Sequence, residues 1–174
     1  MVLSLTACQS SKNESANNIT AASTESVTET SVTSDTEKSI IGNAQIPNPF
    51  TDCDTLDDAA AIAGFSISLP DTAAGYSRSA ISAIENEMID VRYTDESDNE
   101  ICIRKGTEKD DISGDYNEYD ENSTVNADGL SVNIRGNDGL VFAASWQSGD
   151  YSYSITSDLG LAKTDIETLV SEIN

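Results

Sequence analysis

The stretch LSVNIRGNDGLVFAASWQSGDYSYSI, residues 130–155, decides the fold. Apolar and polar residues alternate in Leu130–Arg135, which is the period of a half-buried strand. Gly136–Gly139 is typical of a hairpin turn, and the chain returns through Leu140–Trp146. A second turn, Ser-Gly-Asp, precedes Tyr151–Ile155. Three strands joined by two tight turns predict an antiparallel meander.

A hairpin is predicted upstream of this meander. Met88–Thr94 and Glu100–Lys105 are strand patterns separated by the polar turn Asp95–Asn99. Phe65–Leu69 alternates like a strand, and Ser79–Glu85 is a weaker strand candidate. These segments extend the expected sheet toward the N-terminus.

Helices are predicted at both ends of the domain. Thr55–Asp58 resembles a capping box, Gly64 fits a helix stop, and Thr164–Glu167 is a second capping box. The last helix carries an apolar stripe at helical spacing, formed by Ile166, Leu169, Val170 and Ile173. The expected fold class is α+β: an antiparallel sheet of about six strands with a C-terminal meander, an N-terminal short helix and a C-terminal amphipathic helix.

The first eight residues resemble a processing signal. Leu5-Thr6-Ala7-Cys8 resembles the lipobox of bacterial lipoproteins, in which a signal peptidase cuts before a Cys that carries a lipid. Residues 1–8 are therefore expected to be the remnant of a lipoprotein signal, with its basic and apolar beginning clipped or upstream of Met1. Lipidation of Cys8 would hold the protein at the extracytoplasmic face of the cell membrane. A chance apolar start before a Cys is the alternative.

Residues 9–45 differ in composition from the rest of the chain. They are rich in Ser and Thr and contain no Phe, Trp, Tyr, Leu or Pro. Such a segment cannot bury enough apolar surface to offset the entropy lost on ordering, so a disordered tether is expected. Residues 46–174 are then expected to form one acidic α+β domain.

Charge restricts the partners that the chain can bind. The 174 residues carry a formal net charge of −22. This charge repels nucleic acid and anionic lipid, so neither is expected as a partner. The membrane is expected as a partner through the lipid anchor alone, beside an unidentified protein, peptide or envelope component. A well-solvated surface on a monomeric domain is the simpler explanation of the acidity.

Residue types exclude several catalytic chemistries. The chain has no His, which removes Ser-His-Asp and Cys-His arrangements. It has no Cys-x-x-Cys pair, which removes zinc ribbons and thioredoxin-like redox sites. Besides Cys8, the chain contains Cys53 and Cys102, which form either a disulfide or two separate thiols.

The acidic segment 106–125 is expected to be a long loop that could hold one irregular strand. It offers Asp110, Asp111, Asp115 and Asp120 as oxygen ligands for calcium, the only cofactor that the composition suggests. The spacing fails that of an EF-hand. A solvated loop without metal is therefore the stronger interpretation of the same residues.

Tyrosines supply a second candidate surface. Tyr151 and Tyr153 share one strand face, and Tyr116 and Tyr119 lie in the acidic loop. Aromatic rings beside carboxylates can bind a cation or a basic peptide. Ordinary cross-strand packing is the alternative for the tyrosines, and burial in the core is favoured for Trp146.

Motifs along the domain carry a family resemblance. In chain order they are Asn48-Pro49-Phe50, the helix 56–64, Ile101–Gly106, Asp111–Asn117, and Trp146 with Tyr151–Ile155 and the closing helix. Together they resemble an uncharacterised domain of Firmicutes (Clostridia-type) surface lipoproteins, also seen in proteins that resemble anti-sigma factors. The resemblance covers most of the domain. It implies a Gram-positive envelope lipoprotein, no established activity and no catalytic residues.

The expected function is a lipid-anchored, non-enzymatic module that binds a partner or senses envelope conditions. The alternative is a carrier that holds a hydrophobic ligand between sheet and helix, which would need a large apolar cavity. The third interpretation is an envelope hydrolase using carboxylates, which would need a cleft carboxylate with a raised pKa.

Overall fold

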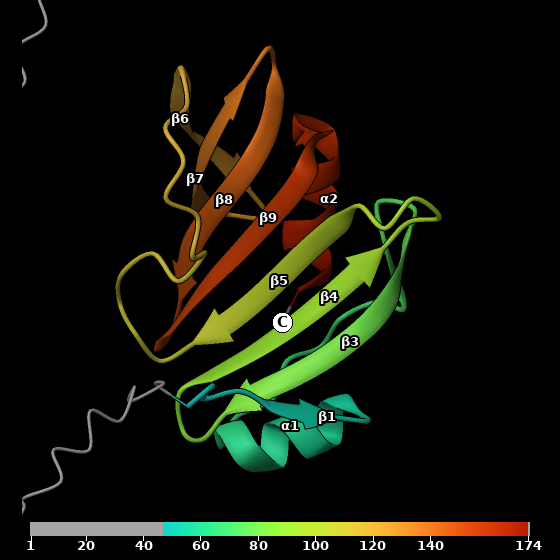
Figure 1. The fold of residues 1–174 in the computed structure, drawn as a ribbon. Coiled ribbons are helices and arrows are strands. Elements are labelled where there is room, and N and C mark those ends of the chain that lie inside the picture. The colour runs from blue at the N-terminus through green and yellow to red at the C-terminus, as the bar shows by residue number, and fades with distance from the viewer. Residues whose placement is uncertain (1–46, 174) are drawn as a thin grey trace, which may run out of the picture. The chain divides into compact units, whose positions relative to one another are not determined.

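The computed structural model describes residues 47–173, which form one antiparallel sheet and two helices (Figure 1). The strands are β1 (Thr51–Cys53), β2 (Thr72–Ala73), β3 (Tyr76–Ile84), β4 (Met88–Thr94), β5 (Glu100–Gly106), β6 (Glu121–Ala127), β7 (Leu130–Asn137), β8 (Leu140–Ser148) and β9 (Tyr151–Ala162). The helices are α1 (Leu56–Ala63) and α2 (Lys163–Glu172). The α+β class is confirmed, but the sheet has nine strands rather than six. The expected lipobox and tether lie outside the described residues.

The sheet is built from two meanders joined side by side. The strand order is β1-β3-β4-β5-β9-β8-β7-β6, with β2 added on β3. Strand β9 closes the second meander and pairs with β5 of the first. The long loop between β5 and β6 must therefore cross from the middle of the sheet to its far edge, as Figure 1 shows.

Alternation along the strands separates an apolar face from a polar face. In β4, Ile89, Val91 and Tyr93 are buried in one hydrophobic core cluster. Asp90 and Arg92 alternate with them and lie on the opposite face. The apolar stripe of α2 and the alanines of α1 belong to the same core cluster, so both helices cover the apolar face. Neither helix has the length and apolar composition needed to cross a membrane.

The expected strand Phe65–Leu69 is wrong, because this segment pairs with no strand of the sheet. Its carbonyl groups are bound by side chains of the sheet instead. Lys105 Nζ donates to the Ser66 carbonyl at 2.7 Å, and Arg78 Nη2 donates to the carbonyls of Leu69 and Pro70 at 3.0 and 2.7 Å. These bonds satisfy the backbone without adding the segment to the sheet.

The first helix begins and ends as its sequence predicts. Thr55 and Asp58 form the capping box, and Gly64 ends α1 in the left-handed region with φ of 79°. The predicted capping box of α2 does not form. Strand β9 runs directly into α2, so Ala162 occupies the N-cap and no side chain caps the helix. The buried stripe predicted for α2 is confirmed.

A bulge in β9 shapes the polar face. Val141 of β8 pairs with Leu161, but Ala143 pairs with Thr156. The segment of β9 between these two pairs therefore contains more residues than the segment of β8 opposite it. Gly160 lies in this bulge with φ of 72°, and a Cβ there would come within 2.9 Å of the Leu140 Cβ atom. Asp158 and Leu159, which precede Gly160 in this bulge, are exposed.

Candidate functional site

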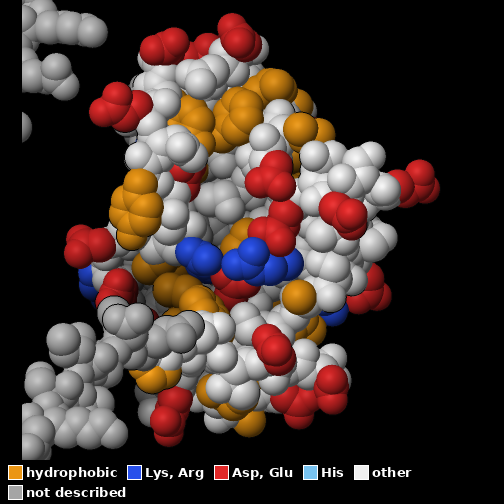
Figure 2. Space-filling view, in the orientation of Figure 1, with side chains coloured by type: hydrophobic (Ala, Val, Ile, Leu, Met, Phe, Trp, Pro, Cys, Tyr) orange, Lys and Arg blue, Asp and Glu red, His pale blue; other side chains and the backbone are white. Residues whose placement is uncertain are grey.

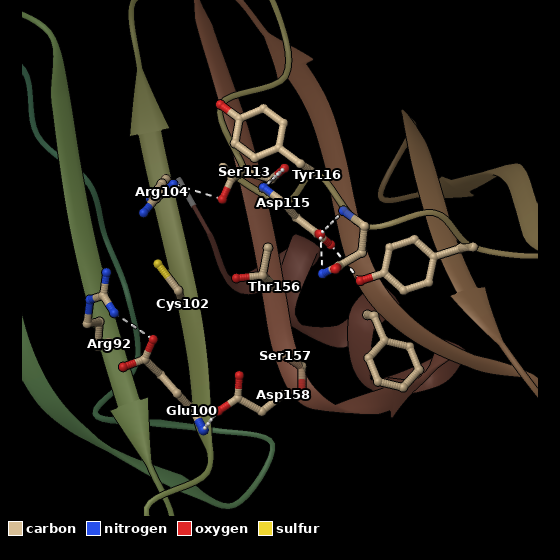
Figure 3. Close-up of a pocket in the computed structure, with 14 residues that line it drawn as sticks. Arg92, Glu100, Cys102, Arg104, Ser113, Asp115, Tyr116, Thr156, Ser157 and Asp158 are labelled. Carbon is tan, nitrogen blue, oxygen red and sulfur yellow. Dashed lines mark hydrogen bonds and ion pairs between the residues drawn. The ribbon is translucent and has the colours of Figure 1, made fainter. Parts of the chain in front are cut away.

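The sheet face opposite α2 is hollowed near its centre, where Figure 2 shows basic side chains flanked by acidic ones. This space, here called the arginine hollow, has a volume of about 550 Å³. It is lined from β4 by Arg92, from β5 by Glu100, Cys102 and Arg104, from the β5–β6 loop by residues 113–117 and Tyr119, from β8 by Phe142, and from β9 by residues 156–158 (Figure 3). A cavity of this size suits a small polar molecule or a short peptide segment.

Asp90 lies beneath the hollow and orients its two arginines. Only 1% of the side chain of Asp90 is exposed. Its Oδ2 atom accepts a hydrogen bond from Arg104 Nε at 2.7 Å, and its Oδ1 atom accepts one from Arg92 Nε at 3.0 Å. Arg92 Nη1 also donates to Glu100 Oε1 at 2.7 Å. One buried carboxylate therefore holds two guanidinium groups in fixed orientations, and a second carboxylate, that of Glu100, also binds Arg92.

Cys102 lies on the floor of the hollow between the two arginines. Its Sγ atom donates to Asp90 Oδ2 at 3.3 Å, and only 6% of the residue is exposed. Burial, with the nearby charge of Asp90, raises the pKa of Cys102 to about 12. The thiol is therefore protonated at neutral pH, which makes it a poor nucleophile.

The loop that crosses the polar face is held against Arg104. Nη1 of Arg104 donates to the carbonyls of Ile112 and Ser113 at 3.1 and 2.8 Å. Gly114 follows with φ of 68°, and a Cβ at this position would lie 2.6 Å from the same Nη1 atom. Glycine at this position lets the backbone approach the guanidinium closely.

Asp115 organises the next part of the loop. Its Oδ2 atom accepts a hydrogen bond from the Tyr119 hydroxyl at 2.7 Å, and its Oδ1 atom accepts bonds from the backbone and side-chain nitrogens of Asn117 at 2.9 and 2.8 Å. Burial acts to raise the pKa of Asp115, but these hydrogen bonds outweigh it and hold the pKa below its ordinary value. Asp115 is therefore an ionised structural carboxylate.

Asp158 and Glu100 form an acidic end of the hollow. Asp158, exposed by the bulge of β9, accepts a hydrogen bond on Oδ2 from the Glu100 backbone nitrogen at 2.9 Å. Figure 3 shows both carboxylates beside Thr156 and Ser157, below the arginines. The Ser157 hydroxyl is buried and has no hydrogen-bond partner within residues 47–173.

An aromatic rim borders the hollow on the side of the loop. Tyr116 is 95% exposed, the most exposed large apolar side chain of the described residues. Tyr119 stacks on Phe142 with ring centroids 5.6 Å apart. An exposed aromatic ring beside a polar hollow is a typical feature of a recognition surface.

Of the two alternatives for Cys53 and Cys102, the structure has two separate free thiols. Strands β3 and β4 separate β1 from β5, which places the two Cα atoms roughly 14 Å apart. A bridge requires a Cα separation under about 7 Å. The register also pairs Cys53 with Ile81, on the core face, while Cys102 lies on the polar face.

The candidate calcium ligands do not come together in the structure. The described residues hold no group of three or more acidic or Cys side chains that could bind a metal ion together. Asp111 is paired with Arg135 Nη2 at 2.8 Å, and both oxygens of Asp115 accept hydrogen bonds from its own loop. Asp110 and Asp120 do not converge with them.

The expected tyrosine surface is divided between two faces of the sheet. Tyr116 and Tyr119 lie at the arginine hollow, whereas Tyr153 is buried and stacks on Trp146 at 5.3 Å. Lys105 Nζ lies 4.7 Å from the ring centroid of Tyr151 and 5.3 Å from that of Tyr153. Tyr151 and Tyr153 therefore pack around a buried lysine, and burial of Trp146 is confirmed.

Sequence reasoning missed the arginines of the hollow. The predicted hairpin of β4 and β5 carries Asp90 and Arg92 on one strand and Cys102 and Arg104 on the other, all at alternate positions. This pattern places charges of both signs on one strand face of an acidic chain. These alternating charges could have indicated a polar site on the hairpin. The loop and β9 that complete the site lie far away in the sequence, so the pattern does not reveal them.

Comparisons with known proteins give no match: no family model, no curated protein and no solved structure matches this chain. The functional argument therefore rests on the geometry of the described residues.

Proposed function

We propose that this protein is a lipid-anchored, extracytoplasmic binding module without enzymatic activity, and that the arginine hollow is its binding site. The observation that carries the proposal is an open, polar cavity of about 550 Å³ with prearranged guanidinium groups and a rim tyrosine that is 95% exposed. Side chains held in place by buried partners lose little entropy when they bind. The lipidation of Cys8 and the tether would present this face outside the membrane.

The carrier alternative receives less support. It needs a large apolar cavity between the sheet and a helix. In the described residues that space is filled by buried side chains, including Ile166, Leu169 and Val170 of α2. The arginine hollow lies on the opposite face and is bordered by charged groups, which do not suit a hydrophobic ligand.

The hydrolase alternative also receives less support. General acid catalysis near neutral pH needs a carboxyl group whose pKa is raised. Asp115 in the hollow has a pKa below its ordinary value, and Cys102 on the floor of the hollow is a buried thiol. These groups stabilise the hollow and are poorly suited to proton transfer or nucleophilic attack.

Chemical-shift mapping tests the binding role. The ¹⁵N-labelled full chain would be titrated with soluble fragments from digested Gram-positive cell wall. We expect shifts concentrated on the amides of Arg104, Tyr116 and Thr156, and a loss of binding in Tyr116→Ala. The matched control is Leu140→Ala, which truncates an exposed apolar residue outside the hollow lining. Shifts confined to the helix-covered face, or no shift at all, would contradict the proposal.

Intact mass spectrometry tests the anchor. Protein purified from the membranes of a Gram-positive host that expresses the gene with its native upstream region should begin at Cys8 and carry a diacylglycerol mass. A Cys8→Ser variant should lose the adduct and leave the membrane fraction. Unmodified residues N-terminal to Cys8 in the mature protein would overturn the lipoprotein interpretation.

A further inference from the structure

We infer that the arginine hollow takes a small zwitterion, an amino acid or short peptide with free amino and carboxylate groups. This inference rests on the proposed function, since it names the ligand class of the same site. The hollow has a cationic centre and an acidic end, and each part has hydrogen-bonding capacity that the fold leaves unused. A ligand carrying both charges matches both parts at once.

The cationic centre can accept a carboxylate. In Arg104, Nε and Nη1 are occupied by Asp90 and by the loop carbonyls, and in Arg92, Nε and Nη1 are occupied by Asp90 and Glu100. Neither Nη2 atom donates a hydrogen bond within the described residues. Both side chains line the hollow, so these Nη2 groups are available to a carboxylate of the ligand.

The acidic end can accept an ammonium group. Asp158 uses Oδ2 for the Glu100 backbone nitrogen, and Glu100 uses Oε1 for Arg92. The second oxygen of each carboxylate has no hydrogen-bond partner within the described residues. A free carboxylate oxygen suits an N–H donor of the ligand, as in an ammonium group.

The charge of the whole chain also favours a zwitterion over a simple anion. With a net charge of −22, the molecule repels a ligand that is only negative, while a zwitterion carries no net charge. A purely cationic ligand would leave the arginine Nη2 groups unpaired and would place its charge near them. The zwitterion avoids both costs.

Three forms of one dipeptide test the inference on the full chain by ¹⁵N chemical-shift titration. The probes are glycylglycine, N-acetyl-glycylglycine, which keeps only the negative charge, and glycylglycine amide, which keeps only the positive charge. We expect glycylglycine to bind about fivefold more tightly than either blocked form, with shifts at Arg104 and Asp158.

Charge-neutral variants assign the two ends. Asp158→Asn should weaken glycylglycine and its amide about fivefold and leave the N-acetyl form unchanged, whereas Arg92→Gln should weaken glycylglycine and the N-acetyl form. The matched control is Asp128→Asn, which removes one exposed charge from a turn outside the hollow lining. Near-ultraviolet circular dichroism verifies that each variant is folded, and Arg92→Lys provides a second test that retains the charge.

The outcomes separate the two proposals. Equal affinity for all three forms, or tighter binding of the N-acetyl form, would overturn the zwitterion while leaving a binding site in the hollow. No shift with any of the three forms would overturn the zwitterion as well. The broader binding role is then judged by the separate titration with cell-wall fragments.

Discussion

The carboxylate of Asp90 accepts a hydrogen bond from Arg104 Nε at 2.7 Å, and only 1% of the Asp90 side chain is exposed. Through Nη1 of Arg104, this buried pair also fixes the loop that covers the polar face. Stability and the shape of the arginine hollow therefore depend on the same carboxylate.

Asp90→Asn should destabilise the fold strongly. Removing one partner of a buried ion pair leaves the remaining charge without compensation, at a cost of about 3 kcal/mol. Urea unfolding monitored by circular dichroism measures this loss. The matched control is Asp71→Asn, which removes a carboxylate that is 97% exposed and lies 3.3 Å from Arg78; it should cost under about 1 kcal/mol. Equal losses of unfolding free energy in the two variants would show that the buried Asp90 pair stabilises the fold no more than the exposed Asp71 pair does.

Gly136→Ala should disrupt the junction of β7 and β8. A Cβ at Gly136 would lie 1.8 Å from the Leu140 carbonyl oxygen, so the backbone must shift, at a cost of about 3 kcal/mol or more. Gly139→Ala in the same hairpin meets no atom within 4 Å and carries only the strain of φ at 76°, about 1 kcal/mol. Thermal denaturation of both variants should rank Gly136→Ala as the less stable. The reverse order would contradict the placement of the bulge at Gly136.

Asp115→Asn should lower stability at neutral pH but not in acid. The folded state holds the pKa of Asp115 below its ordinary value, so ionised Asp115 stabilises the fold above the unfolded pKa of about 3.9. This contribution is lost as the pH falls through the folded pKa. The difference in Tm between wild type and variant should therefore shrink between pH 7 and pH 2.5. The matched control is Asp110→Asn, which removes an exposed carboxylate of the same loop that lacks these hydrogen bonds.

Cys102 should resist thiol reagents until the protein unfolds. Because its pKa is about 12, the thiolate fraction at pH 8 is about one in ten thousand, and burial blocks access as well. In a Cys8→Ser background, dithionitrobenzoate should modify Cys53 in the native protein and both thiols in urea. A native Cys53–Cys102 disulfide found by peptide mapping, or rapid native labelling of Cys102, would contradict this arrangement.

Local patterns were sufficient where an element makes its contacts within itself or with its sequence neighbour. The capping box of α1 joins Thr55 to Asp58, and the hairpins of β4–β5 and β7–β8 pair adjacent segments. The predicted capping box of α2 failed because β9 continues into the helix and takes Ala162 as the N-cap. Adjacent strands can thus override a local helix-start signal.

Strand alternation alone did not decide which segments joined the sheet. Phe65–Leu69 alternates, yet Lys105 and Arg78 bind its carbonyls and keep it outside the ladder. Glu121–Ala127 contains few apolar residues, yet it becomes β6 because it pairs with β7 along its full length. The pairing partner determines the outcome in both cases.

The sequence by itself determined the α+β class, the C-terminal meander, the apolar stripe of α2 and the absence of histidine chemistry, because periodicity, turn residues and composition are local properties. Only the tertiary structure decided the crossing of the loop, the separation of Cys53 from Cys102 and the arginine hollow. Arg92 of β4 and Asp158 of β9 line the same hollow on either side of β5. Between β5 and β9 the chain first crosses to the far edge of the sheet and returns through β6, β7 and β8. Contacts between segments so distant in sequence depend on strand order, and strand order leaves no periodic signal in the sequence.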